Sequence, residues 1–169
     1  MNYTEKHYKE ARMVSIQAHG NQTYDSIYPY YKHLDDVVDV MKRFGFSGKF
    51  IIAALLHDII EDTSLSYKKV KKYFGLEIAE MVYCVTDELG RDRDEVHRKT
   101  LPKTASNPDA IILKLADRIA NVEHGGKIDM YASEYKEFKG ILYLNTPKDA
   151  LAMWDHLDTL LKKDLVVSI

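Results

Sequence analysis

Residues 50–63 read F-I-I-A-A-L-L-H-D-I-I-E-D-T, and this stretch decides the fold class of the chain. Seven apolar residues run without a break into His57 and Asp58, and two more apolar residues precede Glu61 and Asp62. A run this apolar is either a buried helix or a buried strand, because periodicity alone does not separate the two. Its length and the two alanines at its centre favour a helix.

The polar end of this run carries donors for a metal. On a helix, side chains three or four residues apart share a face, so His57 lies beside Glu61, and Asp58 lies beside Asp62. Burying these carboxylates together without a cation is unfavourable, because charged groups in a low-dielectric interior lose their hydration. The sequence therefore leaves two interpretations, a metal site or an exposed acidic helix end.

The composition is that of one globular domain over residues 1–169, and a domain of this length buries roughly 70% of its unfolded surface. A net charge of −2 provides no global basic field for nucleic acid or an anionic membrane. The single cysteine, Cys84, excludes an internal disulfide and suits a reducing compartment. The first residues lack the apolar core of a signal peptide, and no apolar run approaches the ~18 residues that span a bilayer. We expect a cytoplasmic protein.

Helical patterns follow one another along the chain, and strand signals are nearly absent. Pro29 is expected to start one helix, and Ser47 to cap the apolar run. Asn107 with Pro108 is expected to start another helix, which Gly125 ends. The pattern predicts an all-α domain of seven to nine helices.

Two further polar residues stand in apolar helical contexts. His33 follows P-Y-Y-K, and Asp117 lies in K-L-A-D-R after an apolar run. A buried aspartate needs a partner, and the adjacent Arg118 points about 100° away on a helix. We expect Arg118 to form an ion pair that orients its helix, and His97 to be a surface or structural residue.

Several motifs in order resemble the HD-domain (p)ppGpp hydrolases of the RelA/SpoT family, in particular the stand-alone small alarmone hydrolases. They are A-H-G-N-Q-T-Y-x3-Y-P-Y-Y-K-H-L, A-A-L-L-H-D-I-I-E-D-T, V-T-D-E, H-R-K and K-L-A-D-R-I-A-N-V, which together run from Ala18 to Val122. The resemblance implies a single compact HD-domain helical bundle. It also implies metal-dependent hydrolysis of the 3′-diphosphate of (p)ppGpp, with release of pyrophosphate, in the stringent response.

The resemblance also assigns roles to residues. The implied metal ligands are His33, His57, Asp58 and Asp117, and the implied catalytic pair is Glu61 and Asp62. The implied substrate-binding residues are Tyr24, Lys103, Lys114, Asn121 and Tyr135. Two imidazoles and two carboxylates suit Mn²⁺ with open positions for water, although Zn²⁺ or Fe²⁺ would also accept these donors.

One departure from the family pattern leaves the substrate open. Tyr24 stands where the family usually carries an arginine, which weakens the inference to a guanosine alarmone. A phosphatase or pyrophosphohydrolase acting on NADPH or a (p)ppApp-like nucleotide is the alternative. An inactive nucleotide-binding domain is a third reading, against which the intact set of six metal and catalytic residues argues. We expect a small-molecule nucleotide as partner, no nucleic acid and no membrane, and a homo-oligomer is compatible with the sequence.

Overall fold

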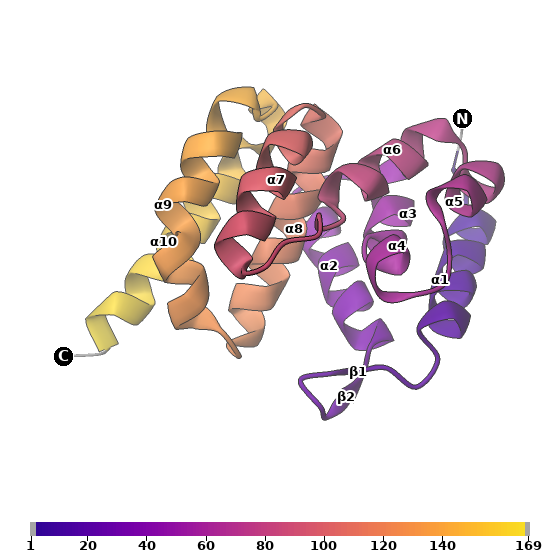
Figure 1. The fold of residues 1–169 in the computed structure, drawn as a ribbon, viewed down its shortest axis with the longest axis horizontal. Helices are drawn as coiled ribbons and strands as arrows, with labels where there is room; N and C mark the ends of the chain where they lie inside the picture. The colour runs from indigo at the N-terminus through magenta and orange to yellow at the C-terminus, as the bar shows by residue number, and fades with distance from the viewer. Residues whose placement is uncertain (1–2, 168–169) are drawn as a thin grey trace.

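The computed structural model describes residues 3–167, and Figure 1 shows that they form a helical bundle with one small hairpin. In chain order the elements are α1 (Glu5–His19), β1 (Thr23–Tyr24), β2 (Tyr28–Pro29), α2 (Tyr31–Arg43), α3 (Lys49–Leu56), α4 (Ile59–Asp62), α5 (Tyr67–Phe74), α6 (Leu76–Val85), α7 (Arg93–Ala105), α8 (Pro108–His124), α9 (Ile128–Leu142), the 3-10 turns η1 (Tyr143–Asn145) and η2 (Lys148–Ala150), and α10 (Leu151–Val167). With α3 and α4 counted as one interrupted segment, the described residues hold nine α-helices, which confirms the predicted fold class. None of the helices in this described part combines the length and hydrophobicity that crossing a bilayer requires.

Helix α8 lies at the centre of the bundle and packs against α2, α3, α6, α7, α9 and α10 (Figure 1). Its start and end confirm the sequence prediction. The side-chain oxygen of Asn107 accepts hydrogen bonds from the backbone N–H groups of Asp109 and Ala110, and Pro108 occupies the first turn. Gly125 ends the helix in the left-handed conformation, with φ of 91°. Because both ends of this central helix are capped, α8 can hold Asp117 in a fixed position.

The apolar run that decides the fold is helical and buried, but the helix is interrupted at its polar end. All six residues from Ile51 to Leu56 are buried. The α-helix stops at Leu56 and resumes at Ile59, and Asp58 has φ of −97° and ψ of 1°. Because adjacent residues on a regular helix point about 100° apart, this interruption is what allows His57 and Asp58 to approach one site.

Two predicted helix starts are wrong. Gly48, with φ of 63°, precedes α3 in place of the predicted cap Ser47, since the chain turns there through a conformation that favours glycine. Pro29 lies in β2, and α2 begins only at Tyr31. The reason is a hairpin in which Tyr24 pairs with Tyr28, too short to show any alternating sequence pattern.

Loss of the Asn107 cap should destabilise the fold measurably. Replacing Asn107 with alanine leaves two backbone N–H groups of the central helix without their acceptor, which should lower the free energy of unfolding by about 1 kcal/mol. The matched control is Ser66→Ala, because Ser66 precedes α5 without a capping side-chain hydrogen bond. Urea denaturation of both variants measures the difference, and equal effects would show that the Asn107 cap contributes nothing special.

Candidate active site

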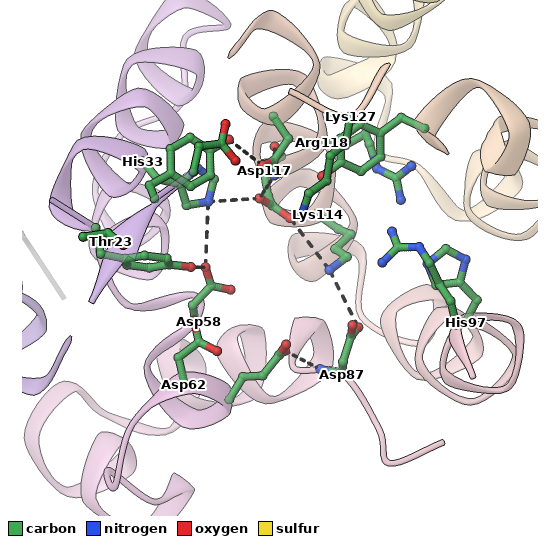
Figure 2. Close-up of a pocket in the computed structure, with 17 residues that line it drawn as sticks. Thr23, His33, Asp58, Asp62, Asp87, His97, Lys114, Asp117, Arg118 and Lys127 are labelled. Atoms are coloured by element: carbon green, nitrogen blue, oxygen red, sulfur yellow. Dashed lines mark hydrogen bonds and ion pairs between the residues drawn. The ribbon is translucent and has the colours of Figure 1, made fainter. Parts of the chain in front are cut away.

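A pocket of about 350 Å³ opens where the hairpin, α2, the α3–α4 junction, α7 and α8 meet. Figure 2 shows His33 and Asp58 on one side of this pocket, His97 on the other, and the neighbouring residues Asp117 and Arg118 between them. The sequence-predicted residues that line it are Tyr24, His33, Asp58, Glu61, Asp62, Lys114, Asp117 and Asn121. His57 is buried directly behind them.

The four predicted metal ligands come together at one point. Nε2 of His33 lies 3.2 Å from Nε2 of His57 and 3.3 Å from Oδ1 of Asp117. Nε2 of His57 lies 2.8 Å from Oδ2 of Asp58. Potential ligand atoms of His33, His57 and Asp58 all lie within 4.8 Å of one another. Two helices and the interrupted segment therefore direct two imidazoles and two carboxylates to the same point (Figure 2).

The position of the hydrogen on the neutral His57 ring makes this donor set fit a cation. Nδ1 of His57 lies 2.8 Å from the backbone oxygen of Ala54. A carbonyl oxygen can only accept, so Nδ1 carries the hydrogen and Nε2 of the neutral ring presents a lone pair to Asp58 and Asp117. A lone pair that faces a carboxylate oxygen requires either a proton or a metal ion between them. The site therefore fits a divalent metal.

The electrostatics of the site agree with this requirement. Burial alone would lower the pKa of His57, but Asp58 and Asp117 raise it well above its usual value. Burial alone would raise the pKa of Asp58, but His57 lowers it to about 2. Burial likewise opposes ionisation of Asp117, yet His33 and His57 hold its pKa well below the usual range. The carboxylates are thus ionised and attract positive charge into the site.

The hairpin region holds the ligand carboxylates from outside. The Tyr30 hydroxyl donates a hydrogen bond to Oδ2 of Asp58. The ring of His19 stacks on Tyr30 with 4.4 Å between centroids, so His19 supports Tyr30 from behind. Nε2 of Gln22 donates to Oδ2 of Asp62 at 2.8 Å. The predicted catalytic Asp62 is therefore anchored to the segment that leads into the hairpin.

Glu61 is held at the edge of the pocket by a backbone N–H group of the loop that follows α6. Its Oε2 accepts a hydrogen bond from the backbone N–H of Asp87 at 2.8 Å. Loss of water around the carboxylate raises the pKa of Glu61 to about 7, and the negative charge of Asp87 adds to this rise. The hydrogen bond from the Asp87 backbone acts in the opposite direction and lowers the pKa. The residue as a whole keeps contact with solvent in the pocket. Such a carboxylate can exchange a proton near neutral pH.

A basic wall, formed by Arg93, Arg118 and Lys127, lines the same pocket as the metal ligands. Arg118 pairs with Glu134 at 3.2 Å, as predicted, and the same carboxylate also pairs with Arg93. One carboxylate thus lies between two guanidinium groups, which leaves the wall positive.

Lys114 lies between this wall and the ligands. Its Nζ is 3.8 Å from Oδ2 of Asp117 and 4.0 Å from Oδ1 of Asp87, so it bridges two acidic residues in the pocket (Figure 2).

Two predicted substrate-binding residues do not reach the pocket. The Tyr135 hydroxyl donates to Asp158 at 2.5 Å, between α9 and α10. Lys103 donates to the backbone oxygen of Thr86 at 2.8 Å and to Glu88 at 2.6 Å. Tyr131, one helical turn before Tyr135, lines the pocket in its place.

Sequence reasoning also missed residues that line the site. Arg93 and His97 lie four residues apart at the start of α7, but their surrounding charged segment is also typical of a solvated surface. Asp87 belongs to the motif V-T-D-E, which signals its presence but not its contact with Glu61. Tyr30 lies in a cluster of tyrosines whose composition does not separate core from site.

Known proteins resemble this chain in sequence and in fold. A guanosine-3′,5′-bis(diphosphate) 3′-pyrophosphohydrolase from Aquifex aeolicus is 38% identical over 112 residues, which cover 63% of this chain and 16% of that protein. The bifunctional (p)ppGpp synthase/hydrolase SpoT from Escherichia coli is 34% identical over 130 residues, which cover 73% of this chain and 18% of that protein. The chain thus spans less than a fifth of the length of these relatives. The similarity to the RelA/SpoT hydrolases that the motifs indicate is confirmed.

A solved structure of a metazoan ortholog of SpoT, described as hydrolysing ppGpp, shares the fold. Its TM-score is 0.75 at 22% sequence identity, and the match covers 97% of this chain and 98% of that one. The family model described as HD domain matches residues 11–134, well over half of the sequence. The chain belongs to the HD-domain family.

Proposed function

We propose that this protein is a metal-dependent hydrolase that removes the 3′-diphosphate of (p)ppGpp and releases GDP or GTP and pyrophosphate. The observation that carries the proposal is the convergence of His33, His57, Asp58 and Asp117 beside the carboxylate of Glu61. The names of the relatives support the same reaction and substrate.

Mn²⁺ is the metal we assign to the four ligands. Two imidazole nitrogens and two carboxylate oxygens would hold the ion, and a donor set without thiolates and with oxygen ligands suits Mn²⁺. The bound ion supplies a Lewis acid that lowers the pKa of water and offsets negative charge on phosphate oxygens.

Glu61 is the general base of the proposed reaction. The oxygen of a water molecule attacks the phosphorus that is joined to the ribose 3′-oxygen, and a proton of this water passes to Glu61. The bond between that phosphorus and the 3′-oxygen breaks and pyrophosphate leaves. The 3′-oxygen takes a proton from solvent to become a hydroxyl, and Glu61 returns its own proton to solvent. The backbone N–H of Asp87 fixes the carboxylate during this transfer, and Asp62 orients the water from the same turn of helix.

The basic wall supports a substrate that carries more than one phosphate group. The metal ligands account for the phosphate that reacts. Arg93, Arg118 and Lys127 line the same pocket, where guanidinium and ammonium groups favour further phosphate oxygens. A nucleotide that carries a second group of phosphates matches this lining.

A nucleotide panel tests the reaction. Metal-loaded protein should release pyrophosphate from ppGpp and pppGpp, more slowly from ppApp, and no phosphate from NADPH. Ion-exchange separation of the products distinguishes pyrophosphate from phosphate. Release of orthophosphate from NADPH as the fastest reaction would contradict the proposal and favour a nucleotide phosphatase, and no turnover of any nucleotide would favour a binding domain.

Metal removal should abolish turnover reversibly. Chelation with EDTA should stop pyrophosphate release, and added Mn²⁺ should restore it. His57→Ala should lower the metal content measured by elemental analysis, because it removes a buried ligand. His156→Ala is the control, since His156 pairs with Glu123 and does not line the pocket. Full metal content in His57→Ala would remove His57 from the ligand set.

Loss of the Glu61 carboxylate should slow the reaction without releasing the metal. Glu61→Gln should reduce kcat about 10²- to 10⁴-fold, as expected for loss of a general base. A base must be deprotonated to accept a proton, so kcat/KM of the wild type should rise with pH, with its midpoint near pH 7 and its plateau above. A bound cation favours the charged form, which places the midpoint at or below this value. A wild-type rate and pH profile in the variant would exclude Glu61 as the base.

A further inference from the structure

Tyr24 is joined to a metal-ligand position by two consecutive hydrogen bonds. Its hydroxyl lies 2.8 Å from Oδ1 of Asn121. Nδ2 of Asn121 lies 2.6 Å from Oδ1 of Asp117 and 3.0 Å from the backbone oxygen of the same residue. The Asp117 oxygen in this chain of bonds is the one that lies 3.3 Å from Nε2 of His33.

The direction of both hydrogen bonds follows from the chemistry of the groups. An ionised carboxylate and a backbone carbonyl only accept, so the amide nitrogen of Asn121 must face Asp117. The amide oxygen of Asn121 then faces Tyr24, and the Tyr24 hydroxyl must be the donor. Among the described contacts, only the Tyr24 hydroxyl donates to the Asn121 oxygen. Removing this hydroxyl would therefore leave the oxygen without a partner and make it easier for the amide to rotate away from the carboxylate.

The ring of Tyr24 is fixed by its neighbours. It stacks on His33 with 4.8 Å between centroids and an interplanar angle of 21°. On another side it contacts His124, with 4.5 Å between centroids. Since two imidazoles already cover this ring, little of it remains for stacking on a nucleobase, and the hydroxyl is the part of Tyr24 that acts on the site.

Tyr30 shows the same arrangement at the other ligand carboxylate. It begins the turn into α2 and donates directly to Oδ2 of Asp58, the oxygen that lies 2.8 Å from Nε2 of His57. The hairpin and its exit thus supply one tyrosine hydroxyl for each ligand carboxylate, one directly and one through Asn121. Groups that orient metal ligands from outside typically change metal affinity 10- to 100-fold when removed.

We propose that Tyr24 is a positioning residue that orients the carboxylate of Asp117 for metal binding through Asn121. This inference rests on the metal site of the proposed function. It assigns Tyr24 and Asn121 a task that is complete before any nucleotide binds, in contrast to the substrate contacts that the sequence implied for both residues.

The test is the Mn²⁺ affinity of metal-free protein, measured by isothermal titration calorimetry without nucleotide. Tyr24→Phe keeps the ring on His33 and removes only the hydroxyl, and it should raise the Kd for Mn²⁺ about tenfold. Tyr28→Phe is the matched control, because Tyr28 lies in the same hairpin, is 45% exposed, and makes no side-chain hydrogen bond to the described residues. Thermal melting of the metal-free variants is the second measurement, and all should melt with the wild type.

A double variant shows whether Tyr24 affects Mn²⁺ binding through Asn121 or independently of it. Asn121→Ala should weaken Mn²⁺ binding at least as much as Tyr24→Phe, and adding Tyr24→Phe to it should change the Kd no further. Wild-type Mn²⁺ affinity in Tyr24→Phe, additive effects in the double variant, or a lower melting temperature of metal-free Tyr24→Phe that accounts for its weaker binding would each overturn the positioning role. Failure of the wild-type protein to bind Mn²⁺ would instead overturn the metal site itself.

Discussion

Two imidazole nitrogens and two ionised carboxylates meet in a buried site, and their mutual repulsion must be balanced by positive charge. The contact of Nδ1 of His57 with Ala54 directs the lone pair of its other nitrogen into this site. The rest of the structure serves to bring these groups together, since α2 carries His33 and α8 carries Asp117. The hydrophobic core behind the ligands keeps His33 and His57 away from bulk water, which strengthens the charge interactions of their side of the site.

The interruption between α3 and α4 is the local feature that makes this convergence possible. A continuous helix would direct two adjacent side chains to different faces, and only one of the two could then reach the ligands on α2 and α8. The six buried residues that precede His57 anchor the segment in the core, so the interruption occurs at a defined position. After it, one further turn of helix carries Glu61 and Asp62 along the floor of the same pocket.

The sequence was sufficient to predict the elements whose signals are local. The Asn107 cap and the Gly125 end of α8 follow from backbone chemistry that each residue carries by itself. The hairpin could not be predicted, because its strands are two residues long and its stability comes from contacts with distant helices. The choice between Tyr131 and Tyr135 also depends on tertiary structure, since both lie on the inner side of one helix and only the packing of α10 draws Tyr135 away.

The turn of the hairpin has a consequence for the energetics of the whole site. Asp25 and Ser26 have φ of 50° and 61°, a left-handed conformation that residues with a Cβ adopt at a cost, on the order of 1 kcal/mol each. Part of this cost is offset by the contact of Oδ2 of Asp25 with Nε2 of His124 at 2.7 Å. If Tyr24 positions Asp117 as proposed, a metal that binds more tightly to the protein with the ordered hairpin must, by reciprocity, stabilise that ordered hairpin by the same free energy.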